Sequence, residues 1–127
     1  MRKAIHSTDD IVAEYAASLI EPDEGHRRAI LERVWSDDCE VVLPEMRIAG
    51  RDAINTHISS IRRSFGGATP VLTGPVDAHH GFLRFEWRMI DAAGDVIAAG
   101  VNFAEQSADG RLRRVVLFRG VRPGQYL

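Results

Sequence analysis

Apolar residues recur at helical spacing in three segments of the first half of the chain. The first segment follows small polar and acidic residues at 7–10, which favour a helix start, and Pro22 ends it. The second begins at about Asp23, and the third runs from about Asp52 to Phe65. We therefore expect three helices. Their predicted buried stripes are, in order, Ile11, Tyr15 and Leu19 with Val12, Ala16 and Ile20; His26, Ile30 and Val34 with Ala29 and Trp35; and Ile54, Ile58, Ile61 and Phe65.

The other segments have the composition and alternation of β-strands. Two short β-prone runs, 39–43 and 46–49, flank Pro44 and predict a small hairpin, with Asp37-Asp38 in the turn that precedes it. After the third helix only strands and turns are expected, and in residues 83–89 apolar and charged residues alternate strictly. Helices followed by an antiparallel meander predict an α+β fold rather than a parallel α/β fold.

Composition narrows the classes of partner and location. A chain of 127 residues fits one domain, which we expect to span 1–127. The net charge is −2 and no basic run exceeds two residues, so neither nucleic acid nor a membrane is an expected partner. The N-terminus lacks the apolar stretch of a signal peptide. The single cysteine, Cys39, cannot form an internal disulfide, which favours a cytoplasmic location.

A set of short motifs resembles the SnoaL-like branch of the nuclear transport factor 2 superfamily by its order and spacing. The motifs are Val34-Trp35-Ser36-Asp37-Asp38, Pro44, Gly50-Arg51-Asp52-Ala53-Ile54, His57-Ile58, Gly100-Val101-Asn102-Phe103 and Asp109-Gly110-Arg111-Leu112. The resemblance implies a cone-shaped α+β barrel, in which three N-terminal helices pack in a curved, mostly antiparallel sheet around an apolar pocket. It also implies a homodimer that forms through the outer face of the sheet.

The superfamily includes ketosteroid isomerase, scytalone dehydratase, limonene epoxide hydrolase and polyketide cyclases, so the fold alone does not fix a reaction. Ketosteroid isomerase-like sites use a tyrosine in the first helix, an acid on a later strand and a carboxylate base just before a proline. Tyr15 and Asn102 match the first two positions, and an amide can still donate to an oxyanion. The residue before Pro44 is Leu43, which cannot take a proton.

His57 is the candidate base instead, because it borders the buried stripe of the third helix and imidazole titrates near neutrality. The three candidate catalytic residues, Tyr15, His57 and Asn102, each have a structural alternative. Tyr15 could be a core aromatic residue, His57 a surface histidine paired with an acid, and Asn102 a strand residue bonded to neighbouring backbone.

Further residues are candidate ligand contacts. Arg84 and Glu86 share a strand face and resemble the arginine and acid of limonene epoxide hydrolase-like sites, although residues 115–119 lack the second acid, and cross-strand ion pairing is the alternative. His79 and His80 are expected to face opposite sides of a strand, so only one could enter a pocket. The candidate ligand-binding residues are Trp35, His80, Arg84, Glu86, Trp87 and Phe103, with Phe85 as a further wall.

No histidine or cysteine spacing indicates a metal site, and no cofactor is expected. The sequence thus predicts a protein that binds a small, largely apolar molecule in an interior pocket. Such a pocket would suit a cofactor-independent isomerase, dehydratase, cyclase or hydrolase that uses acid–base catalysis. The alternative is a non-catalytic ligand-binding or dimeric assembly domain of the same fold, which the missing base before Pro44 favours.

Overall fold

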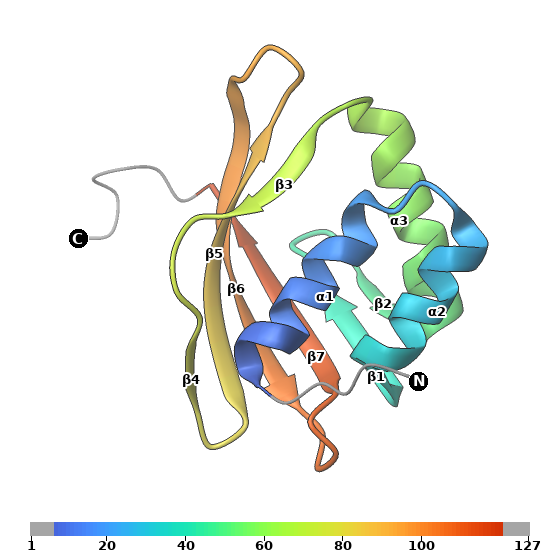
Figure 1. The fold of residues 1–127 in the computed structure, drawn as a ribbon, viewed down its shortest axis with the longest axis vertical. Helices are drawn as coiled ribbons and strands as arrows, with labels where there is room; N and C mark the ends of the chain where they lie inside the picture. The colour runs from blue at the N-terminus through green and yellow to red at the C-terminus, as the bar shows by residue number, and fades with distance from the viewer. Residues whose placement is uncertain (1–6, 121–127) are drawn as a thin grey trace.

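The computed structural model describes residues 7–120, which form three helices and a curved sheet (Figure 1). Helices α1, α2 and α3 lie together on one side of the sheet, and the predicted α+β class is confirmed. In chain order the elements are α1 (Thr8–Ile20), α2 (Glu24–Val34), β1 (Trp35–Val42), β2 (Arg47–Ala49), α3 (Arg51–Phe65), β3 (Thr69–Leu72), β4 (Asp77–His79), β5 (Phe82–Ile90), β6 (Val96–Gln106) and β7 (Leu112–Arg119).

The strands of the described region form one sheet in the order β2-β1-β7-β6-β5-β3, and β4 pairs with β5. Pairing is antiparallel throughout except between β1 and β7, which run parallel. The sheet is therefore mostly antiparallel, as predicted. The long strands β5 and β6 are in register over most of their length, with Phe85 opposite Asn102 and Trp87 opposite Gly100.

Local sequence accounts for the ends of the helices. Ser7 caps α1, because its hydroxyl accepts a hydrogen bond from the backbone of Asp10 at 3.1 Å. Asp23 caps α2 in the same way, through the backbone N–H of His26 at 2.8 Å. At the start of α3, Gly50 has a φ of 91°, a left-handed conformation that glycine adopts at little cost.

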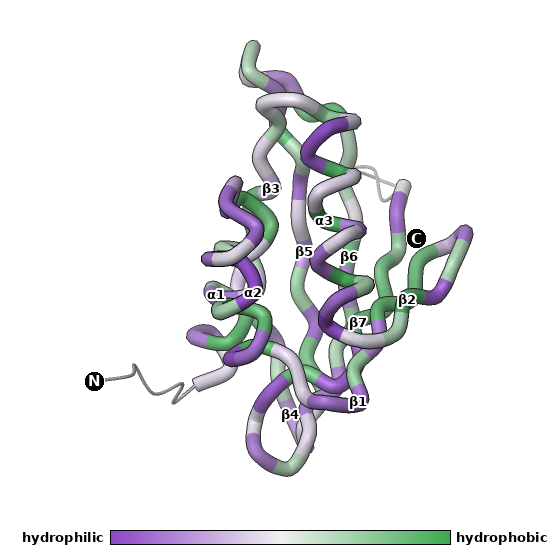
Figure 2. Tube along the Cα trace, turned by 90° about the vertical axis from the view of Figure 1, so that its right-hand side faces the viewer, coloured by the Kyte–Doolittle hydropathy of each residue, from purple (hydrophilic) through white to green (hydrophobic). Residues whose placement is uncertain are grey.

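The core lies between the helices and the inner face of the sheet. In Figure 2, hydrophilic and hydrophobic residues alternate along α3, as an amphipathic helix on a core requires. At the centre of the core, the ring of Tyr15 packs edge-on against Trp35 and Phe85, with centroids 6.1 and 5.7 Å away. These contacts join α1, β1 and β5.

The predicted stripe of α2 was right towards the end of the helix, where Val34 and Trp35 are buried and Ile30 is half-buried. It was wrong at His26 and Ala29, which are exposed, and it missed Arg27 and Leu31, which are buried. The guanidinium of Arg27 can be buried because it donates only to oxygens of nearby loops and helices. Its partners are the carbonyl oxygens of Glu21, Pro22 and Asn55, the side-chain oxygen of Asn55 and the hydroxyl of Ser59. Buried polar atoms are tolerated when each is hydrogen-bonded.

Strand β1 begins directly at Trp35, so Asp37 and Asp38 lie in a strand rather than in the predicted turn. Arg51 contacts the start of this strand: its Nε donates to the carbonyl oxygen of Trp35 at 3.1 Å, and its Nη2 pairs with Asp37 at 2.5 Å. This contact holds the pKa of Asp37 below its ordinary value. The Gly50-Arg51 motif therefore ties the start of α3 to the start of β1.

The expectation for the two adjacent histidines was also wrong. His79 ends the short strand β4, and His80 lies in the turn before β5 with a φ of 51°. Both side chains are exposed, and their rings touch edge-on. The strand alternation expected for them does not apply, because a tight hairpin turn separates β4 from β5.

Candidate functional site

A cavity of about 330 Å³ lies between the helices and the inner face of the sheet. Its walls come from α1, α3 and β3 and from inward-facing residues of β1, β5, β6 and β7. Most of the lining is apolar, and the volume lies at the lower end of the range of about 300–1,000 Å³ common for small-molecule sites. Leu43, which precedes Pro44, is one of the lining residues and offers no titratable group.

Three of the lining residues form a hydrogen-bonded chain across the sheet and α1. The indole Nε1 of Trp87 donates to Oδ1 of Asn102 at 2.9 Å. The Nδ2 of Asn102 then donates to the hydroxyl oxygen of Tyr15 at 3.4 Å. Asn102 and Tyr15 are both buried, with 2% and 8% of their surface exposed. Residues from three separate elements thus place amide and hydroxyl groups at the wall of the cavity.

Burial controls the protonation of Tyr15. It raises the pKa of Tyr15 to about 12, and the hydrogen bond from Asn102 opposes this rise only in part. The hydroxyl therefore keeps its proton throughout the physiological range. A protonated phenol beside an amide is a hydrogen-bond donor for a ligand oxygen, not a base.

His57 lines the same cavity from α3. Burial lowers the pKa of His57 below its ordinary value; Glu45 opposes this effect and Arg119 adds to it. Glu45 and Arg119 form a bidentate ion pair at 2.6 and 2.9 Å, so their opposite charges lie together beside the histidine. The imidazole is neutral at pH 7 and can accept a proton.

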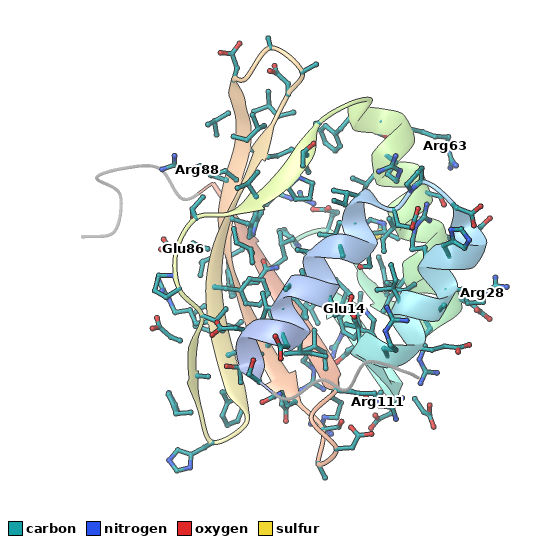
Figure 3. All side chains as sticks on the ribbon, viewed as in Figure 1. Glu14, Arg28, Arg63, Glu86, Arg88 and Arg111 are labelled. Atoms are coloured by element: carbon teal, nitrogen blue, oxygen red, sulfur yellow. The ribbon has the colours of Figure 1, made fainter. Side chains whose placement is uncertain are left out.

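The other candidate residues divide into two groups. Trp35 and Trp87 line the cavity, as does Phe85. His80, Arg84, Glu86 and Phe103 do not. In a strand, neighbouring residues face opposite sides, so Arg84 and Glu86 lie on the outer face because Phe85 and Trp87 face inward. Figure 3 shows Glu86 and Arg88 on the side of β5 away from the helices.

The outer-face residues have other contacts. Arg84 pairs with Asp77 of the neighbouring strand β4 at 3.3 Å, which is the cross-strand alternative considered for it. Phe103 packs edge-on against Phe118, with ring centroids 5.7 Å apart. Neither residue could contact a ligand in the cavity without crossing the sheet.

Sequence reasoning missed several parts of the lining. Residues 67–72, Leu117 and the cation Arg62 all contribute to it. The helical spacing that indicated Ile58, Ile61 and Phe65 could have indicated Arg62, which follows one turn after Ile58 on α3. The short strand β3 gave no such signal, because only its pairing with β5 brings it over the cavity.

In the part of the chain that the structure describes, no three histidine, cysteine or acidic side chains come together in a way that could hold a metal ion. No helix within residues 7–120 has the length and apolar character needed to cross a membrane.

The helices, the curved, mostly antiparallel sheet and the cavity between them define an α+β cone of the nuclear transport factor 2-like class. A SnoaL-like family protein from Agrobacterium tumefaciens str. C58, for which isomerase activity has been suggested, superimposes with a TM-score of 0.83. The two are 33% identical over 87% of this chain and 95% of that one. This protein therefore belongs to the SnoaL-like family.

Two more distant structures share the fold alone. A nuclear transport factor 2-like protein of unknown function from Exiguobacterium sp. 255-15 has a TM-score of 0.70 at 18% identity, covering 88% of this chain and 99% of that one. A protein from Jannaschia sp. CCS1, suggested to be a SnoaL-like polyketide cyclase, has a TM-score of 0.66 at 11% identity, with coverages of 92% and 91%. No protein-family model and no curated protein matches the sequence.

Proposed function

We propose that this protein binds a small, largely apolar molecule in the cavity and acts on it by acid–base catalysis without a cofactor. The observation that carries the proposal is the presence of both kinds of group in the lining of one mostly apolar cavity. His57 is a neutral imidazole that can take a proton, and Tyr15 and Asn102 can donate to an oxygen. The suggested isomerase activity of the Agrobacterium relative agrees with this combination.

The simplest reaction for these groups is proton transfer at a carbon next to a carbonyl. The imidazole of His57 takes the proton, and the electrons of the C–H bond form the enolate. The hydroxyl of Tyr15 and the amide of Asn102 stabilise the enolate oxygen. His57 then returns the proton to the same carbon or to another carbon of the enolate, so the atoms balance without a further reactant.

Hydrogen–deuterium exchange of β-tetralone tests this proposal, because its acidic α-protons exchange through an enolate. We expect the protein to accelerate exchange in D2O, followed by NMR, and His57→Gln to lower the rate by about 100-fold or more. His26→Gln is the matched control, since His26 is exposed on α2. Exchange no faster than in buffer, or a fully active His57→Gln variant, would remove the catalytic proposal.

A second proposal concerns assembly: a homodimer forms through the outer face of the sheet. Phe82, Phe103 and Phe118 leave 54%, 45% and 49% of their surfaces exposed there, and Phe103 contacts Phe118. Exposed apolar patches of this kind favour protein–protein contacts. A dimer that neither binds a ligand nor accelerates hydrogen–deuterium exchange would support the alternative of a non-catalytic assembly domain.

Light scattering after size exclusion measures the assembly state directly. We expect a dimer for the natural sequence and a monomer for Phe103→Asp. Met46→Asp is the control, because Met46 is equally exposed, at 49%, but lies in the turn between β1 and β2. A monomeric natural protein, or loss of the dimer in both variants, counts against this interface. The cytoplasmic location stays a prediction from the sequence.

A further inference from the structure

We propose that Trp87 is a positioning residue that fixes the direction of the hydrogen bonds in the cavity. Through Asn102, it makes Tyr15 a donor toward the cavity, so that the site selects ligands with an acceptor oxygen such as a ketone. This inference rests on the proposed function, because it concerns the ligand of the same cavity. The inference gives Trp87 a role beyond that of an apolar residue in the cavity wall.

The orientation of the Asn102 amide follows from the chemistry of indole. An indole N–H can only donate, so the atom 2.9 Å from Nε1 of Trp87 has to be the amide oxygen. The amide nitrogen must then face Tyr15, at 3.4 Å. An amide nitrogen has no acceptor capacity, so the hydroxyl of Tyr15 accepts this bond. Its own proton is left for another partner.

The cavity, which Tyr15 lines, can supply that partner. Within residues 7–120, the hydroxyl of Tyr15 makes its one side-chain hydrogen bond with Asn102, and both residues line the cavity. The side-chain nitrogen of Asn102 likewise makes one hydrogen bond within these residues, to Tyr15, so its second N–H can donate to a ligand. The wall therefore offers an O–H and an N–H donor to a ligand at this point. Its raised pKa keeps Tyr15 in the protonated form that this role needs.

Gly100, which lies directly opposite Trp87 on β6, leaves room for the indole. A Cβ atom at position 100 would come within 2.6 Å of Cζ2 of the indole. The ring therefore lies against the bare backbone of Gly100, where a larger side chain would displace it. In this position the ring directs Nε1 at the amide oxygen of Asn102.

The chain provides a matched control for a test of Trp87. Trp35 also lines the cavity. Its Nε1 is buried and makes no hydrogen bond within the described residues. Trp87→Phe and Trp35→Phe remove the same atoms from the same cavity. Only Trp87→Phe removes a hydrogen bond that orients Asn102.

The experiment compares the affinities of β-tetralone and tetralin, which share a carbon skeleton and differ by the carbonyl. We expect the natural protein to prefer the ketone by roughly tenfold, the effect of about one hydrogen bond. Trp87→Phe should abolish this preference while binding tetralin nearly as well, because the amide can then turn its oxygen toward Tyr15. Trp35→Phe should keep the preference. The infrared carbonyl stretch of bound β-tetralone should shift toward its unbonded position only in Trp87→Phe and Tyr15→Phe.

A double variant separates positioning from a direct contact. If Trp87 acts through Tyr15, adding Trp87→Phe to Tyr15→Phe should cause little further loss of ketone affinity. Equal losses for ketone and hydrocarbon in Trp87→Phe, or an unchanged ketone preference, would overturn the positioning role while the cavity proposal stands. Failure of the natural protein to bind either molecule would overturn both proposals.

Discussion

The guanidinium Nη1 of Arg27 lies 2.9 Å from the side-chain oxygen of Asn55, and both residues are 2% exposed. This contact joins α2 to α3 inside the protein. Because α3 carries His57 and much of the cavity wall, Arg27 helps to set the position of the site from outside it.

Replacing Arg27 with Met should destabilise the protein by about 2–4 kcal/mol, because the oxygens it serves become buried acceptors without a donor. Urea unfolding followed by circular dichroism measures this change. Arg28→Met is the control, since Arg28 is exposed, and should stay within about 0.5 kcal/mol. If Arg27→Met were as stable as its control, the hydrogen bonds would have no net effect on folding.

Gly100→Ala should destabilise the protein by about 2 kcal/mol or more. The added methyl group would overlap both the indole of Trp87 and the backbone carbonyl of Phe118, and the carbonyl cannot move without disturbing β7. Gly74→Ala should be neutral, because a Cβ at position 74 meets nothing. Thermal unfolding compares the two variants, and similar midpoints would show that the sheet yields at position 100.

The pKa of His57 should respond in opposite directions to the two charges beside it. Glu45→Gln removes the negative charge that raises this pKa and should lower it further, whereas Arg119→Gln should raise it. NMR titration of the imidazole protons measures both. Shifts in the same direction would show that the ion pair acts on His57 by changing its burial instead of through its charges.

The lowered pKa of His57 also determines whether its contribution to folding stability rises or falls with pH. Between the folded pKa and the ordinary value near 6.5, the unfolded chain binds more protons, so stability rises with pH in this window. His57→Gln should flatten that part of the stability curve measured by urea unfolding at a series of pH values. If the slope in His57→Gln were as steep as in the natural protein, the pH dependence would come from other groups.

Asp109 should contribute stability that is lost in acid. Its carboxylate accepts from the hydroxyl of Ser107 and from the backbone and Nε of Arg111, which lower its pKa from 3.8 to about 2. The contribution is complete above the unfolded pKa and falls as the pH drops toward 2. Asp109→Asn should weaken the β6–β7 turn at pH 7 but change little at pH 2. NMR titration of the carboxyl carbon checks the midpoint.

The periodicity of the sequence determined the helices, the strand alternation and the α+β class. The family resemblance led to Tyr15 and Asn102 as candidate catalytic residues, and helical spacing led to His57; all three line one cavity although they are far apart in the chain. These features were predictable because spacing decides which side chains share a face of a helix or strand.

Which face of a strand points inward was decided only by the tertiary structure. In β6 the polar Asn102 faces the cavity and the apolar Phe103 faces outward, the reverse of what hydropathy alone favours. The inversion is possible because Trp87 and Tyr15 satisfy the buried amide. Arg27 was missed for the same reason: its burial depends on oxygens that lie close to it only after α1, α2 and α3 pack together.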